Sequence, residues 1–510
     1  MTALCSAVFL TACGDDDAPI NEAVKGSISL SGTARVNETL SIENDFTDRN
    51  GIENITASYQ WYGNGSAIAD ATEATYQLSA SELLQDVHVV LDFVDDDGFS
   101  EALTSESVNI YEAYKLSMVL DREDTVGITK TGIYGQSWVA ATQPTSSAGE
   151  EHTTPSIAAD EKGNLVAVTA SVNGDFGPDS DIVITRSTDN GTTWSNVSLL
   201  LADDTDADVS PVVATDKNGN WIVVWSSDRA ADTTNNNFDI FYSTSTNNGE
   251  QWSEAESLNE WAAADAHDDN TPQVSINDDN WVVIWSSAHN PDTDSIKNPD
   301  NDTEIYSSFS SDGGESWNTA KRISKGAIDN DTADTTPKVH VNSSGRGLVI
   351  WTAEDDEDGN TDTDVYAART TNFGSSWVAG FILNKQTAST DAATDNEEAS
   401  SVYTLADGTY VAAWYGFVDA DITNQGAFYA SSSDSGLVWS NTVKLENEAG
   451  VDEITPNVIA KPNGDWFASW VEEATGKVWV VESDDELSTW SSVPVDVNQT
   501  SSGLIDWVIH

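Results

Sequence analysis

Cysteine is almost absent from this chain of 510 residues. The only two cysteines, Cys5 and Cys13, lie near its start, which excludes the disulfide framework typical of small secreted domains. Long apolar runs are also absent: beyond the first residues, no stretch approaches the roughly 20 consecutive apolar residues that a transmembrane helix needs. The sequence therefore predicts a fold stabilised by ordinary side-chain packing.

Basic residues are also scarce. The chain has 21 Lys and Arg against 86 Asp and Glu, a formal net charge of −65. Such a field repels phosphate backbones and anionic lipid headgroups, so we expect no nucleic-acid partner. Self-repulsion on this scale destabilises a compact fold unless salt screens it or divalent cations neutralise it. We therefore expect a salty environment, bound divalent cations, or both.

Aromatic residues are plentiful, with 19 Trp, 13 Tyr and 13 Phe. Although the hydrophobic fraction is only 38%, this aromatic content argues against wholesale disorder. The composition predicts a folded protein with a polar surface.

Residues 10–13, LTAC, resemble a bacterial lipobox, in which one apolar and two small residues precede a cysteine. The resemblance implies cleavage before Cys13 and lipidation of its thiol. We assign residues 1–24 to a lipoprotein signal and an acidic linker, and expect a cell-envelope location, at the outer membrane or cell surface, or secretion. The preceding apolar stretch is only about a dozen residues long and lacks a positive segment, so we expect the true start to lie upstream. The alternative is an apolar terminus that is not processed.

Residues 25–111 alternate apolar and polar side chains, with turn signals at SIENDFTDRNG, WYGNGS and VDDDGFS. This pattern predicts about seven short strands in a β-sandwich. The segment SYQWYGNGSAIADATEATYQL resembles bacterial surface immunoglobulin-like modules, with Trp61 and Tyr76 as expected core aromatics. The alternative is an unrelated sandwich, and either one would serve as a spacer.

From residue 113 onward an eight-residue motif, Ser-x-Asp-x-Gly-x-x-Trp, recurs at intervals of about 60 residues. Its Asp or Asn can accept backbone N–H bonds, its Gly can adopt a positive φ, and its Trp can bury against a sheet. We therefore predict a structural role for the motif. Its positions in the six copies are Asp189, Gly191 and Trp194; Asn247, Gly249 and Trp252; Asp312, Gly314 and Trp317; Asn372, Gly374 and Trp377; Asp434, Gly436 and Trp439; and Asp485 and Trp490.

The motif resembles the Asp-box, or BNR repeat, of the sialidase superfamily, in which it joins the third and fourth strands of each propeller blade. With four strands predicted between successive copies, the fold class is all-β: a small sandwich followed by an Asp-box β-propeller over residues 113–510. Six complete strand sets fit between about residues 150 and 498. Remnants at 113–145 and in GLIDWVIH at the carboxyl end would form a composite seventh blade, so we favour seven blades over six.

Candidate chemistry should lie on the face opposite the Asp-boxes, where blade-to-blade loops lead into the innermost strands. Each of these loops is acidic, for example at Asp208 before Pro211, at Glu397 and Glu398, and at Glu453 before Pro456. This predicts an acidic collar around the central channel. Carboxylates in such a collar and in neighbouring loops suit Ca²⁺. A solvated acidic surface is the alternative. The candidate metal ligands are Asp203, Asp206, Asp208, Asp268, Asp269, Asp356, Asp358 and Asp362.

The superfamily resemblance implies a sialidase site with three arginines, a Tyr–Glu nucleophile pair and an Asp acid/base. The chain has only eight arginines, none after Arg369, and only Arg229 falls clearly on the loop face. Carboxylates that could cleave a glycoside are too numerous to select. The nominal candidates are those that follow second strands: Glu354, Asp355, Glu472 and Glu473. Trp261, Tyr415 and Phe417 could stack on sugars or simply pack within blades.

Three hypotheses remain open. The first is an adhesion or binding module whose acidic loop face engages a glycan or surface-protein ligand with Ca²⁺. The second is an exo-sialidase or another glycoside hydrolase, with Arg229 and Glu354 as nominal catalytic residues. The third is an envelope scaffold. No motif for an organic cofactor is present.

Overall fold

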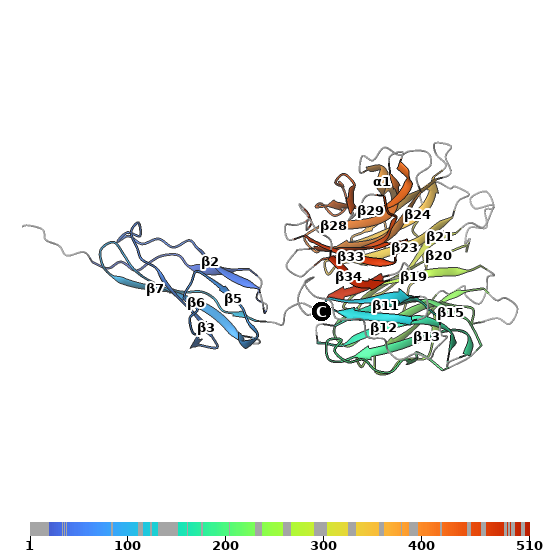
Figure 1. Cartoon of the computed structure of the whole chain (residues 1–510), viewed down its shortest axis with the longest axis horizontal. Coiled ribbons are helices and arrows are strands. Elements are labelled where there is room, and N and C mark those ends of the chain that lie inside the picture. The colour runs from blue at the N-terminus through green and yellow to red at the C-terminus, as the bar shows by residue number, and fades with distance from the viewer. Residues whose placement is uncertain are drawn as a thin grey trace, which may run out of the picture. The chain divides into compact units, whose positions relative to one another are not determined.

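The computed structural model divides the chain into two compact units, Met1–Tyr114 and Lys115–His510 (Figure 1). The structure describes residues 20–510 except for 33, 35, 37, 83–84, 111–115, 123–124, 131–150, 161, 175–176, 203–204, 230–236, 259–266, 290–302, 325–332, 356–361, 379, 387–395, 419–420, 446–449, 461–465, 484–486, 488–489, 491–494, 501–504 and 510. No helix among these residues is long and apolar enough to cross a membrane.

The first unit consists of two antiparallel sheets. One sheet contains β1 (Ile28–Ser31), β2 (Thr39–Asn44) and β5 (Thr75–Gln77). The other contains β3 (Ser58–Gly63), β4 (Ser66–Ala67), β6 (Asp86–Val94), β7 (Ser100–Thr104) and β8 (Val108–Asn109). A 3₁₀ turn, Ala80–Glu82, precedes β6.

One hydrophobic core lies between these sheets. Leu40 of the first sheet and Trp61 and Val89 of the second are buried in the same cluster. The Trp61 ring packs against Tyr76 with a centroid distance of 5.6 Å, and its Nε1 donates to the Glu73 carbonyl. The alternating burial of β6 is the pattern of a strand with one face on the core.

The second unit contains six four-stranded antiparallel sheets, which we number as blades 1–6. Blade 1 comprises β11 (Glu151–Ala159), β12 (Leu165–Gly174), β13 (Gly177–Ser187) and β14 (Ser198–Leu199). Blade 2 comprises β15 (Asp208–Thr215), β16 (Trp221–Ser227), β17 (Asp239–Ser245) and β18 (Glu256–Ser257). Blade 3 comprises β19 (Asp269–Asn277), β20 (Asn280–Ser287), β21 (Glu304–Ser310) and β22 (Lys321–Arg322).

Blade 4 comprises β23 (Asp334–Val341), β24 (Gly347–Asp355), β25 (Asp362–Thr370) and β26 (Phe381–Ile382), followed by the short helix α1 (Leu383–Gln386). Blade 5 comprises β27 (Glu397–Thr404), β28 (Tyr410–Val418), β29 (Asp421–Ser432) and β30 (Val443–Leu445). Blade 6 comprises β31 (Glu453–Ala460), β32 (Trp466–Glu472), β33 (Lys477–Ser483) and β34 (Val495–Thr500).

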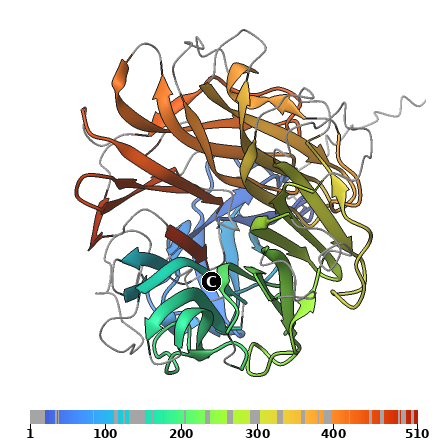
Figure 2. The ribbon, with the colours of Figure 1, turned by 90° about the vertical axis from the view of Figure 1, so that its right-hand side faces the viewer.

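A seventh sheet combines the two ends of this unit. Its strands are β9 (Leu116–Arg122), β10 (Thr125–Lys130) and β35 (Ile505–Ile509), in the order β10–β9–β35. The carboxyl-terminal β35 contacts β11 of blade 1, so the ring closes through both ends (Figure 2). The prediction of an all-β chain with a propeller closed by a composite seventh blade is thus confirmed. The expected third strand, SWVAATQ, lies outside the described residues.

Burial in the second strands explains why the blades form. In β16 (WIVVWSS) and β32 (WFASWVE) every residue is buried. One face of β16 packs on blade 1 and the other on blade 3, and one face of β32 packs on blade 5. The first strands of neighbouring blades contact one another and surround the axis of the ring. Blade packing therefore positions the first strands, which carry the candidate site.

The first strands share a local distortion near their beginning. In blades 1–4 and 6, a Ser or Thr with positive φ lies two or three residues after the first residue of the strand and is followed by proline, as at Ser210 (φ 54°) and Thr455 (φ 48°). The strand register shifts at this point, as in a β-bulge. In blade 5 the register shifts between Ala399 and Ser401 without a proline. This bulge fixes which side chains face the axis.

The Asp-box turns form the hydrogen bonds expected of a turn staple. In blade 1, the Oδ1 of Asp189 accepts from the Ser187 hydroxyl (2.9 Å) and from the Thr193 N–H (2.7 Å). The Ser187 Oγ in turn accepts from the Gly191 N–H at 2.9 Å. The same pattern recurs at Asn247, Asp312, Asn372 and Asp434. Asp485 lies outside the described residues.

Candidate functional site

The acidic collar is present at the start of the first strands. These strands begin with Glu151, Asp208, Asp269, Asp334, Glu397 and Glu453. All but Glu151, whose side chain is not described, are at most 5% exposed. In blade 1 the buried side chain at the corresponding distance from the bulge is His152. The collar is therefore largely an internal feature of the blades.

Hydrogen bonds tie collar residues to the second strand of the same blade. The Nε1 of Trp225 donates to Asp208 at 3.0 Å, and the Nε1 of Trp470 donates to Glu453 at 3.1 Å. A buried carboxylate requires such donors. In these two blades the collar carboxylate accepts an indole hydrogen bond, a structural role for which a metal ion is not required.

The expected metal ligands are distributed as follows. Asp208 and Asp269 are buried strand residues, Asp206 is half-buried, and Asp268 is exposed and accepts from the Phe238 N–H. Among the described residues, these four do not form a group of three with metal-ligand spacing. Asp203, Asp356, Asp358 and the Asp362 side chain lie outside what the structure describes.

The nominal catalytic residues do not come together. Glu354 is exposed near the end of β24 in blade 4, whereas Arg229 follows β16 of blade 2 and lies 3.9 Å from both Asp206 and Asp208. Arg322 binds Glu304 at 2.7 Å, and Arg346 reaches Ser435 of an Asp-box. The described arginine side chains therefore form no carboxylate clamp.

A cluster of polar side chains does form at blade 5. Glu398 lies directly opposite Tyr415 in the β27–β28 ladder, and the two side chains are hydrogen-bonded. Glu473, which follows β32 of blade 6, is close enough to act electrostatically on Tyr415, and its N–H donates to the Asp452 carbonyl. Glu398, Tyr415 and Glu473 form what we call the blade 5 cluster.

Lys338 of blade 4 extends this cluster across the axis. Burial lowers the pKa of Lys338, while the negative charges of Asp506 in β35 and Glu398 oppose that shift. Lys338 retains some solvent-accessible surface although protein encloses it, as expected of a side chain that faces the axis of the ring. Blades 4, 5 and 7 thus contribute charged groups to one region.

The electrostatics define what the blade 5 cluster can do. Burial raises the pKa of the Tyr415 phenol, and Glu398 and Glu473 raise it further. Tyr415 is therefore a neutral hydrogen-bond donor at pH 7, while the carboxylates accept hydrogen bonds. The arrangement is suited to bind hydroxyl or ammonium groups.

The sequence indicated parts of this cluster. Glu398 belonged to the predicted collar, and Tyr415 and Glu473 were nominal candidates, but nothing singled out Lys338. One signal was available: Lys338 is the only Lys or Arg in β11, β15, β19, β23, β27, β31 and β35. Of the other suggested aromatics, Phe417 is half-buried in β28, and Trp261 lies outside the described residues.

Two surface hollows lie beside the Asp-box hairpins and not at the blade 5 cluster. One, of about 640 Å³, lies between blades 5 and 6 and is lined by residues that include Asp434, Trp439 and Trp466. The other, of about 320 Å³, lies between blades 3 and 4 beside Arg322 and Trp377. Both occur where one blade meets the next, so blade packing accounts for them.

Comparison with known proteins finds only distant structural similarity. No protein-family model and no curated protein matches the chain. Several solved structures are similar at low identity, which concerns the fold alone. A polysaccharide lyase of family PL25, an ulvan lyase, is 12% identical (TM-score 0.46; 67% of this chain and 81% of the lyase covered). Penicillium chrysogenum alpha-L-arabinanase is 14% identical (TM-score 0.41; 70% and 93% covered). Trypanosoma rangeli sialidase is 11% identical (TM-score 0.38; 66% and 54% covered).

Proposed function

We propose that the propeller binds neutral or amino-sugar-containing glycans through the blade 5 cluster. The observation that carries this proposal is the Glu398–Tyr415 pair beside Glu473 on the loop side of the ring. Carboxylates accept hydrogen bonds from sugar hydroxyls, and a neutral phenol both donates to a sugar and packs against it. The net charge of −65 disfavours anionic glycans.

The same charges argue against sialic acid as the ligand. A sialoside carboxylate is held best by bidentate arginine pairs. Arg229 already lies beside Asp206 and Asp208, and the charged groups that act on Tyr415, Glu398 and Glu473, are acidic. Binding of a neutral or cationic sugar requires no such clamp.

A glycan array with the purified chain tests this proposal, at high salt and with either Ca²⁺ or chelator. We expect binding to neutral or amino-sugar glycans, and at least about tenfold weaker binding for Tyr415→Phe, which removes the phenolic hydroxyl, and for Glu398→Gln, which removes the charge of the accepting carboxylate. Glu315→Gln, an exposed carboxylate of an Asp-box turn, is the matched control. Equal binding by all variants, or selective binding of sialosides, would contradict the proposal.

Glycoside hydrolysis is the second candidate, favoured by the two carboxylates that flank Tyr415. A panel of fluorogenic glycosides, including a sialoside, separates it from binding. Turnover that Glu398→Gln and Glu473→Gln both abolish would make this region catalytic, with Glu315→Gln again as control. A folded protein without turnover leaves binding as the function.

We also propose that Cys13 carries a lipid that anchors the chain to the cell envelope. Metabolic labelling with an alkyne fatty acid tests this, since label should enter the wild type and not Cys13→Ser. A surface-protein ligand or scaffold role predicts cross-linking to specific envelope proteins. Dependence of that cross-linking or of glycan binding on Ca²⁺ would support metal binding by the loops.

A further inference from the structure

Three carboxylates from separate parts of the first unit converge on one point. Asp48 follows β2, Asp95 directly follows β6, and Glu101 lies in β7. One oxygen from each lies within 4.8 Å of the others, and this is the one group of three acidic, His or Cys residues with such spacing among the described residues. The group lies outside the propeller and belongs to neither the collar nor the blade 5 cluster.

Each of these three carboxylates has one oxygen without a hydrogen-bond donor. Three oxygens are buried and have no hydrogen-bond partner: Asp48 Oδ2, Asp95 Oδ2 and Glu101 Oε1. Asp95 as a whole is only 5% exposed. Desolvating a carboxylate oxygen without compensation is costly. Mutual repulsion of three such charges within 5 Å adds to that cost.

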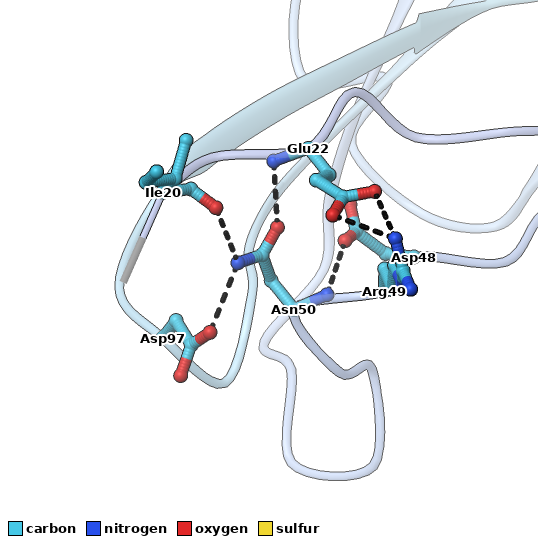
Figure 3. A network of polar contacts seen from close by, with 6 residues as sticks. All are labelled: Ile20, Glu22, Asp48, Arg49, Asn50 and Asp97. Atoms are coloured by element: carbon cyan, nitrogen blue, oxygen red, sulfur yellow. Dashed lines mark hydrogen bonds and ion pairs between the residues drawn. The ribbon is translucent and has the colours of Figure 1, made fainter. Parts of the chain in front are cut away.

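The second carboxylate oxygen of each aspartate, Oδ1, accepts backbone N–H bonds. Asp48 Oδ1 accepts from the Asn50 N–H at 2.8 Å. Asp95 Oδ1 accepts from the N–H groups of Asp97 (3.0 Å) and Phe99 (2.8 Å). These bonds fix both turns and leave each Oδ2 as the oxygen without a donor. The nearby cation, Arg49, binds Glu22 at 2.9 Å instead (Figure 3).

We propose that Asp48, Asp95 and Glu101 bind a divalent cation, with Ca²⁺ as the preferred ion. Ca²⁺ takes hard oxygen ligands in flexible geometry, with backbone carbonyls or water completing the shell, whereas Mg²⁺ demands near-ideal octahedral ligands. Three carboxylates on turns and a strand edge meet the first requirement. The ion supplies the positive charge that the group lacks.

Binding at this point would also order residues 20–22, which Asn50 holds by hydrogen bonds. The Asn50 side chain donates to the Ile20 carbonyl (3.1 Å) and to Asp97 (2.9 Å), and its Oδ1 accepts from the Glu22 N–H (2.9 Å) (Figure 3). Asn50 lies two residues after Asp48, and Asp97 two after Asp95. An ion that fixes both turns therefore also stabilises the hydrogen bonds between Asn50 and residues 20–22.

Hydrogen exchange of the full-length chain tests the proposal locally, which matters because so acidic a protein also binds Ca²⁺ diffusely. With Ca²⁺ at about 100 times its Kd, we expect about 100-fold slower exchange in peptides covering residues 44–54 and 94–102 than in chelator. Mg²⁺ should protect these peptides less. Peptides covering residues 20–24 should become more protected together with them.

Three variants distinguish Ca²⁺ bound at this site from general screening of the negative charge of the protein. Asp95→Asn removes the charge of the carboxylate but keeps an oxygen that can accept the N–H bonds of the turn. Glu101→Gln removes the charge of the carboxylate in β7. Both variants should lose the Ca²⁺-induced protection. Asp92→Asn, an exposed carboxylate on β6, should retain it. The site is refuted if wild type shows no local protection, or if both ligand variants keep it. Because the wild-type comparison stands alone, a variant that fails to fold does not leave the proposal untested.

Discussion

The indole Nε1 of Trp225 donates a hydrogen bond of 3.0 Å to Asp208, the first residue of the innermost strand in blade 2. Trp470 and Glu453 repeat the relationship in blade 6 at 3.1 Å. All four side chains are buried. In both blades an acidic residue before the bulge therefore locks the first strand to the second.

We expect Asp208→Ala to lower the free energy of unfolding of the propeller by about 3 kcal/mol, because it leaves the buried indole N–H of Trp225 without an acceptor. Asp208→Asn, which can keep an oxygen acceptor, should cost clearly less. Urea denaturation followed by tryptophan fluorescence measures both. If the two variants were equally stable, the hydrogen bond would not be the source of the effect.

The Asp-box predicts a pH dependence at its first copy. The backbone N–H of Thr193, with further hydrogen bonds from the Thr193 and Ser187 side chains, lowers the pKa of Asp189 to about 2. A carboxyl whose pKa is lower in the folded state stabilises the fold fully above its unfolded pKa of about 4, and this stabilisation is lost as the pH falls towards 2.

Asp189→Asn is the informative variant, because Asn247 and Asn372 occupy the same position in other copies. We expect it to match the wild type at pH 7 within a few tenths of a kcal/mol and to lack the extra loss below pH 4, whereas Asp189→Ala should be less stable at pH 7 by about 1 kcal/mol. Urea midpoints between pH 7 and 3 check this. Parallel pH profiles for wild type and Asp189→Asn would contradict it.

A second pH dependence of stability, at higher pH than that of Asp189, is expected from His340. Burial, and to a lesser degree the positive charge of Lys217, lowers the pKa of His340 to about 4. Its Nδ1 lies 2.9 Å from the Thr404 hydroxyl and accepts from the Thr404 N–H at 3.1 Å, and its ring stacks on Tyr403. The neutral imidazole is therefore the form that fits the fold.

Since the unfolded chain takes up this proton near pH 6.5, stability should fall as the pH drops from about 6.5 to 4, by up to about 3 kcal/mol. His340→Gln removes the titration. Its loss of unfolding free energy between pH 7 and 4 should thus be smaller than that of the wild type, although it is less stable at pH 7. An identical pH dependence of the two proteins would show that His340 does not titrate as expected.

Local spacing made most of the architecture predictable. The Ser-x-Asp-x-Gly-x-x-Trp turns and the strands between them lie within single blades, so periodicity alone located them. The composite seventh blade followed from counting strands, and β35 pairs with β9. The collar position was predictable from the acidic residues before Pro211 and Pro456.

The roles of the same residues were not predictable. Burial of Asp208 depends on Trp225 of another strand, and no local pattern distinguishes it from a loop aspartate. The Lys338 and Glu398 side chains act on each other electrostatically because the first strands of blades 4 and 5 are neighbours around one axis. The turns VDDDGFS and SIENDFTDRNG were recognised as turns, but only the packing of the sandwich brings Asp48, Asp95 and Glu101 to one point.

In the third Asp-box, a buried tryptophan leaves no room for a side chain at the glycine position. Gly314 has φ of +82°, and a Cβ there would lie 2.5 Å from Cζ3 of Trp281, which is 1% exposed and cannot move aside. Gly450, in the same unit, also has positive φ (+90°) but no neighbouring atom within 4 Å. Gly450→Ala should therefore cost only the backbone strain, about 1 kcal/mol, whereas Gly314→Ala adds an overpacking cost of about 1 to 3 kcal/mol. Urea denaturation of both variants measures the difference, and equal losses would mean that the backbone conformation, not contact with Trp281, accounts for glycine at this position.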